Sequence, residues 1–122
     1  MPLIVCKIGD GEDVMETVKE FCEKNSVAYG DFVSASGKIA DFEISAFSGS
    51  GSIENKTSST PHDVVAISGK IQMARGAYQI NLKMALARSG LNAIQGMLLK
   101  GNASGNLEIG IRNVDLKKII EA

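Results

Sequence analysis

Two amide side chains, Gln79 and Asn81, alternate with apolar residues between Tyr78 and Ala87. A period of two is typical of a half-buried strand, so both amides should project from its polar face. Amide groups donate and accept hydrogen bonds, but they cannot act as a general base or as a strong metal ligand. The pair is therefore a candidate for binding a polar ligand, and it argues against catalysis at this strand.

His62 is the single histidine and lies between Pro61 and Asp63. Its imidazole has the chemistry of a general base, and Asp63 is close enough in sequence to hold the ring. A solvated residue at the end of a loop is the favoured interpretation. Neither Ser59 nor Ser68 lies in a recognisable nucleophile motif.

Two other patterns suggest ligand loops, but both have a simpler explanation. Gly37-Lys38 and Gly69-Lys70 are each followed by Ile, where a P-loop needs a Ser or Thr to hold magnesium. The acidic run over 10–13 does not have the spacing of a calcium loop. It favours the start of a helix, with Asp10 as the capping residue.

Length and composition favour one small domain. The 122 residues suit a single domain over 1–122, and a hydrophobic content of 44% supports a packed core. The net charge of −1 disfavours direct nucleic-acid binding, which depends on phosphate neutralisation by Lys and Arg. Cys6 and Cys22 lie in apolar patterns typical of free, reduced cysteines. Since no stretch approaches the ~20 apolar residues of a membrane helix, we expect a soluble, cytoplasmic protein.

Hydrophobic periodicity predicts one long helix near the N-terminus, which ends at Asn25. Its apolar stripe consists of Val14, Val18, Phe21 and Cys22. Most of the remaining chain has strand-like patterns, with a polar loop over 48–62 and a hairpin turn at 74–76. The predicted strands cover 2–8, 29–39, 39–47, 63–73, 78–87 and 107–112.

Two segments near the C-terminus are candidates for short helical turns. The apolar run over 91–100, interrupted by Gly96, can form a helical turn that enters a strand, and 115–122 can form a final turn. A different feature is the sequence Ser-Gly-Lys-Ile, which occurs at 36–39 and again at 68–71. Four residues are too few to indicate a repeat, but they predict two similar strand bulges in which glycine relieves steric crowding.

The order of these elements resembles the plant-and-prokaryote-conserved (PPC) domain, over about Leu3 to Val114. The resemblance is carried by Gly11-Glu12-Asp13-Val14, by Val64 to Ile71 and by Tyr78 to Gly101. Members of that family usually assemble as trimers. The resemblance therefore implies a homotrimer with an α+β fold, in which a mostly antiparallel sheet accompanies one long N-terminal helix and a short second helix.

Many members of the family carry a His-x-His pair and a Gly-Gly-His-Leu segment, whose three histidines look like a metal site. By this resemblance, the three positions fall on Gln79, Asn81 and Met97. Amides and a thioether do not hold zinc with useful affinity. The resemblance thus implies a degenerate metal pocket without metal or cofactor, which could accept a small polar ligand. The alternative is that Gln79 and Asn81 merely face solvent or a neighbouring subunit.

These observations favour a non-catalytic, oligomeric module with a regulatory or protein-interaction role and no membrane contact. Two alternatives stay open. One is a metal-dependent lyase or hydrolase with unrecognised ligands, for which His62 is the first suspect. The other is a DNA-binding regulator, although the chain has no Arg-Gly-Arg segment like the basic hook with which plant members of the family bind DNA.

Overall fold

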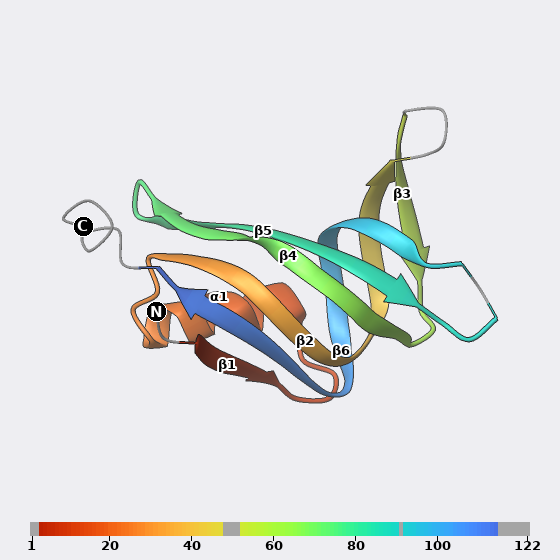
Figure 1. Ribbon diagram of the computed structural model, residues 1–122, viewed down its shortest axis with the longest axis horizontal. Coiled ribbons are helices and arrows are strands. Elements are labelled where there is room, and N and C mark those ends of the chain that lie inside the picture. The colour runs from red at the N-terminus through yellow and green to blue at the C-terminus, as the bar shows by residue number, and fades with distance from the viewer. Residues whose placement is uncertain (1–2, 48–51, 91, 115–122) are drawn as a thin grey trace.

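The computed structural model describes residues 3–47, 52–90 and 92–114. This part of the chain forms six strands and one helix (Figure 1). The strands belong to one antiparallel sheet with the order β1-β6-β5-β4-β2-β3. The elements are β1 (Leu3–Ile8), α1 (Val14–Lys24), β2 (Tyr29–Phe47), β3 (Ile53–Ser58), β4 (His62–Ala74), β5 (Ala77–Ala87) and β6 (Ile94–Asn113).

The fold is mainly β, so the expected α+β class with two helices is wrong. Among the described residues, α1 is the only helix, and it has 11 residues. Of the segment 91–100 that was expected to contain a helical turn, residues 94–100 belong instead to the 20-residue strand β6. The other expected turn, over 115–122, lies outside the described residues.

Four strands close into a ring. β2 pairs with β4, β4 with β5, and β5 with the first part of β6. β6 then pairs with β2 and completes the cycle. At the other end of the sheet β6 also pairs with β1, so one long strand joins the closed ring to the open part of the sheet (Figure 1).

Helix α1 begins and ends at specific polar residues. The Asp13 side chain accepts a hydrogen bond of 2.9 Å from the backbone N–H of Glu16, which makes Asp13 the N-cap. The predicted cap, Asp10, is wrong, because its carboxylate accepts instead from the N–H of Gly105 at 2.7 Å. The predicted end at Asn25 is confirmed, but the left-handed backbone falls on the next residue, Ser26, with φ of 55°.

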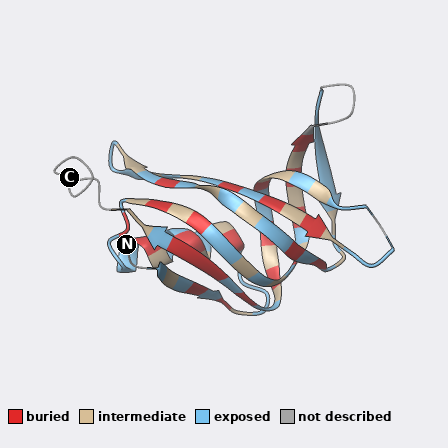
Figure 2. Ribbon diagram, in the orientation of Figure 1, coloured by how far each residue is buried: buried red, intermediate tan, exposed pale blue. Residues whose placement is uncertain are grey.

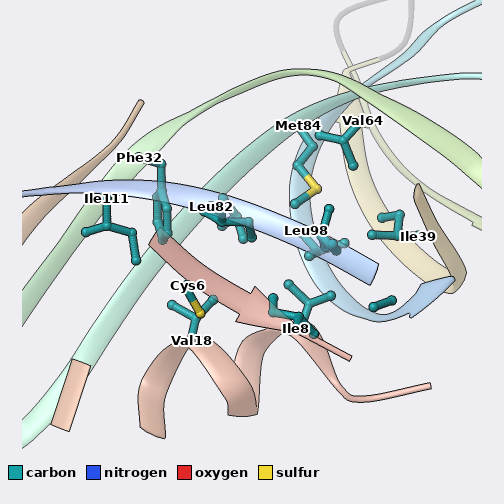
Figure 3. Close-up of a cluster of buried hydrophobic side chains, with 14 of the residues drawn as sticks. Cys6, Ile8, Val18, Phe32, Ile39, Val64, Leu82, Met84, Leu98 and Ile111 are labelled. Atoms are coloured by element: carbon teal, nitrogen blue, oxygen red, sulfur yellow. The ribbon is translucent and has the colours of Figure 1, made fainter. Parts of the chain in front are cut away.

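The core lies between α1 and the inner face of the sheet, where "inner" means the face that α1 covers. The helix buries Val14, Val18 and Cys22, as its apolar stripe predicts. In Figure 3, β1 lies above the helix, and both elements contribute side chains to the cluster. Fully buried partners from the sheet include Cys6, Ile8, Leu82, Leu107, Ile109 and Ile111.

Two strand regions were not predicted because both of their faces have the same polarity, which hides the period of two. β3 was expected to be part of a polar loop, and its residues are exposed on both faces except for the half-buried Ser58 (Figure 2). Its strand character comes from pairing with β2, not from burial. In β6, Leu98 is buried while its neighbours Met97 and Leu99 project outward, so an apolar run conceals the alternation.

Where two strands over 29–39 and 39–47 were predicted, the structure has the single strand β2 with a bulge at 36–38. The pairing of β2 with β6 shifts register between Ser36 and Lys38, and Gly37 there has φ of 135°. Gly69, in the second copy of Ser-Gly-Lys-Ile, has φ of 125°. A Cβ at Gly37 would meet the backbone of Asn106 at 2.8 Å, and one at Gly69 would overlap the carbonyl oxygen of Asn81. Both glycines relieve crowding as predicted, but only Gly37 lies at a bulge, because β4 pairs with β5 without a register shift around Gly69.

Candidate functional site

The strand that carries the amides has the predicted alternation. Leu82, Met84 and Leu86 are buried on the inner face of β5, while Gln79 and Asn81 are exposed on the outer face. The predicted hairpin is also confirmed. Arg75 and Gly76 form its two-residue turn with φ of 52° and 77°, and β4 returns antiparallel to β5.

The register of this hairpin determines which side chains lie beside the amides. Gln79 is opposite Gln72, and Asn81 is opposite Lys70. The next outward pair joins Lys83 to Ser68. All six are exposed, so they form a continuous polar surface on the side away from α1. We call this surface the outer ribbon; it consists of Ser68, Lys70, Gln72, Gln79, Asn81 and Lys83.

The three positions aligned with metal ligands do not converge on one point. Met97 is half-buried on β6 and lies opposite Lys83. Asn81 is its diagonal neighbour on the same face, two residues along β5. Gln79 lies four residues from Lys83, about 14 Å along the strand, and beyond the end of the β5–β6 pairing. The structure thus places Asn81 near Met97 and Gln79 farther away.

This arrangement does not fit a zinc ion. The available donors are two neutral amides and one thioether, and Lys83 lies directly opposite Met97 and two residues along β5 from Asn81. A cation placed there would meet a positive charge and no carboxylate, imidazole or thiolate. Within residues 3–47, 52–90 and 92–114, no group of three or more His, Cys, Asp or Glu side chains could hold a metal ion.

Sequence reasoning missed the two lysines of the outer ribbon. In the described chain, the one ion pair joins Arg112 to Asp31, with 2.9 Å between guanidinium and carboxylate. Asp31 is also the cross-strand neighbour of Lys70 on β2, but it is engaged by Arg112. The outer ribbon therefore presents two positive charges together with neutral amides. The signal was available, because the short turn fixes the register that brings Lys70 beside Asn81.

His62 is buried at the start of β4, so the favoured expectation of a solvated loop residue is wrong. Its side chain is 5% exposed and meets the ring of Phe42 edge-on, with 5.0 Å between centroids. Nδ1 lies 2.9 Å from the carbonyl oxygen of Thr60. Since that oxygen can only accept, Nδ1 carries the hydrogen. Asp63 is exposed on the opposite face of β4 and does not hold the ring, so the predicted His62–Asp63 pair is not formed.

The two cysteines are free and buried, and the prediction that they pack as small apolar side chains is confirmed. Burial raises the pKa of Cys6 to about 12, with smaller contributions from nearby Cys22 and Glu12. Burial likewise raises the pKa of Cys22 to about 11, with help from Glu23. Both groups are thiols at neutral pH, and thiols are poor nucleophiles and poor metal ligands.

Exposed aliphatic side chains gather on the same face as the outer ribbon. Six large apolar residues of the described chain are between 40% and 66% exposed. One of them, Ile53, lies on β3. The other five project from the outer side of the sheet, opposite to the buried side chains of their strands: Leu3, Val5, Val33, Val65 and Leu99.

A ring of four strands, one covering helix and an open outer face define a mainly β domain, and known structures share this fold. A PPC protein from Pyrococcus horikoshii superposes with a TM-score of 0.80 at 15% identity, covering 94% of this chain and 80% of its own. A metal-containing protein from Archaeoglobus fulgidus gives 0.76 at 16% identity, covering 91% and 78%. A "putative DNA-binding protein" from Bacteroides thetaiotaomicron gives 0.79 at 18% identity, covering 93% and 78%.

The family of this chain is established by sequence. The description "Plants and Prokaryotes Conserved (PCC) domain", the PPC domain named above, matches residues 1–115. The chain therefore belongs to the PPC domain family, as its motifs predict. No curated protein matches the sequence. In the described part of the chain, α1 is too short to cross a membrane, and no other helix is present there.

Proposed function

We propose that this chain is a non-catalytic PPC module that assembles as a homotrimer and serves a regulatory or protein-interaction role. The observation that carries the proposal is the composition of its outer face. Five exposed aliphatic side chains lie on the same side of the sheet as its lysines and amides. Burying the part of one such side chain that is still exposed stabilises an assembly by about 1 kcal/mol, roughly half the value for a fully exposed side chain. A mixture of apolar and polar groups is typical of protein interfaces.

The chemistry of the described side chains supports the non-catalytic part of the proposal. His62 is buried, and its Nδ1–H is engaged by the Thr60 carbonyl. The cysteines are protonated, and the aligned metal positions hold Gln79, Asn81 and Met97. These three side chains lie on an open face of the sheet and do not point toward a common centre. A small polar ligand bound there would therefore need further contacts from a neighbouring copy.

The trimer predicts the mass of the protein in solution. Light scattering coupled to size exclusion should give three times the 12.9 kDa of one chain at micromolar concentration. On dilution the trimer should dissociate reversibly into monomers, and the protein concentration at the midpoint measures the strength of the assembly. A mass of 12.9 kDa at all concentrations would remove the assembly role.

The non-metal character predicts the elemental composition of the purified protein. Protein prepared without chelators and dialysed against zinc-containing buffer should retain far less than one zinc per chain, because amides and a thioether bind zinc weakly. An Asn81→His/Met97→His variant provides a comparison, since it supplies imidazoles at the two positions that lie near each other and should retain more zinc than the unaltered protein. Stoichiometric zinc in the unaltered protein would revive the metal-dependent alternative, with His62→Ala as the next variant to analyse.

A further inference from the structure

Charge is distributed unevenly along the chain. The β4–β5 hairpin, residues 62–87, carries three basic side chains and one acidic, a net charge of +2, and the basic Arg88 follows directly. Residues 10–24, which lead into and form α1, carry six acidic side chains and two basic, a net charge of −4. The near-neutral total of −1 thus conceals a basic region and an acidic region.

The acidic charges of α1 are concentrated on one side of the helix. Glu16, Glu20 and Glu23 recur at i, i+4 and i+7, and all three are exposed. Side chains at this spacing are neighbours on a helix, so their like charges repel one another. We call these three residues the acidic stripe. None of them forms a salt bridge within the described part of the chain.

The acidic stripe and the outer ribbon cannot meet within one chain. Lys70 and Lys83 project away from the core, because Ile71 and Leu82 beside them point into it. The helix packs on the inner face, so its exposed side is separated from the outer ribbon by the sheet itself (Figure 1). Lys19 and Lys24 flank the acidic stripe on α1, and Asp31 lies opposite Lys70 on β2. In the described part of the chain, none of these residues forms a salt bridge with the acidic stripe or the outer ribbon, so the charges of both surfaces are available to a second molecule.

We infer that the acidic stripe of one copy docks on the outer ribbon of the next copy, an inference that rests on the proposed homotrimer. The dimensions agree, since Glu16 to Glu23 spans about 10 Å of helix and Gln79 to Lys83 about 14 Å of strand. The carboxylates meet the ammonium groups of Lys70 and Lys83. The amides of the ribbon donate additional hydrogen bonds to the same carboxylates.

Such a contact joins two different surfaces, so it is heterologous, and a heterologous contact repeated about a threefold axis closes a ring. Within that ring every acidic stripe and every outer ribbon is used once. Val65, on the outer side of β4, and Val33, on the outer side of β2, provide apolar contacts around the charged centre. Aliphatic groups beside lysines favour a protein partner over a nucleic acid, for which phosphate contacts dominate.

Charge reversal on each surface, followed by restoration, tests the contact. Sedimentation velocity should show that Lys70→Glu/Lys83→Glu weakens self-association about tenfold or more, because like charges then face each other. Glu16→Lys/Glu20→Lys should have a similar effect. The chain that carries all four substitutions should regain most of the association, since its helix is basic and its ribbon acidic. Lys56→Glu/Lys100→Glu makes the same change of charge outside both surfaces and should leave association unchanged.

The possible results separate the inference from the proposed function. Circular dichroism first establishes that each variant is folded. If the unaltered protein is a trimer and neither reversal weakens it, the contact is wrong while the proposed assembly stands. If the unaltered protein is a monomer, the proposed function fails and the contact with it. Binding of the unaltered protein to duplex DNA at ~50 mM salt, lost in Lys70→Glu/Lys83→Glu without a change in mass, would assign the ribbon to nucleic acid and overturn the inference.

Discussion

Replacing Gly69 by alanine is expected to lower the free energy of unfolding by more than about 4 kcal/mol, enough to unfold a typical domain of marginal stability. The backbone at Gly69 has φ of 125°, a conformation that residues with a Cβ rarely adopt and that costs about 1–3 kcal/mol. In addition, the new Cβ would overlap the Asn81 carbonyl oxygen on the adjacent strand. Relief requires separation of β4 from β5 within the closed ring, which breaks ladder hydrogen bonds. Urea unfolding followed by circular dichroism measures the loss.

Gly76 provides a matched control in the same hairpin. Its φ is also positive, at 77°, but a Cβ there would have no atom within 4 Å. Gly76→Ala should therefore lower the free energy of unfolding by only about 1–2 kcal/mol, the cost of placing an alanine at positive φ. Equal losses in the two variants would contradict the close approach of β4 to β5 at Gly69.

Truncating Leu82 to alanine should cost about 2–5 kcal/mol, the usual range for a buried leucine whose removal leaves a cavity. Leu82 is completely buried and belongs to the main core cluster (Figure 3). Its strand pairs with β4 and cannot collapse freely onto the space, because the ring holds its backbone in place. The free energy of unfolding from denaturant titration, with an unchanged m-value, gives the magnitude.

The neighbouring residue is the control for Leu82. Asn81 lies on the same strand but projects from the exposed outer face, so Asn81→Ala should change the free energy of unfolding by about 0.5 kcal/mol or less. A large loss for Asn81→Ala would mean that the outer ribbon contributes to the stability of a single chain. That result would also weaken its assignment as a surface for a partner.

The sequence predicted best those elements whose burial follows a simple period. β5 and α1 each have one buried side and one exposed side, and both appear where their periodicity places them. The turn between β4 and β5 was predictable because Gly76 readily adopts the positive φ that a two-residue hairpin turn requires. The family was also predictable, because motifs in the correct order carried the resemblance.

The fold class and the environment of His62 were not predictable for physical reasons. β3 has no buried face, so only its pairing with β2 marks it as a strand. β6 has apolar residues on both faces near Leu98, which conceals its period. His62 is buried because the first residue of β4 pairs with Ile39 and packs beside Phe42, and contacts between such distant segments leave no local signal.

Because β6 pairs with three other strands, the sheet cannot be completed until late in the synthesis of the chain. Leu3 of β1 pairs with Arg112 of β6. The first strand of the chain therefore has no neighbour in the sheet until the C-terminal part of β6 has been synthesised. The ring cannot close before β6 emerges from the ribosome, since β6 supplies the connection between β5 and β2. Contacts of such large sequence separation make folding slow, because much chain entropy is lost before they form. Until synthesis passes residue 113, β2 and β5 of the nascent chain each lack their β6 neighbour, and the solubility of the chain depends on the charged and polar residues along these unpaired edges.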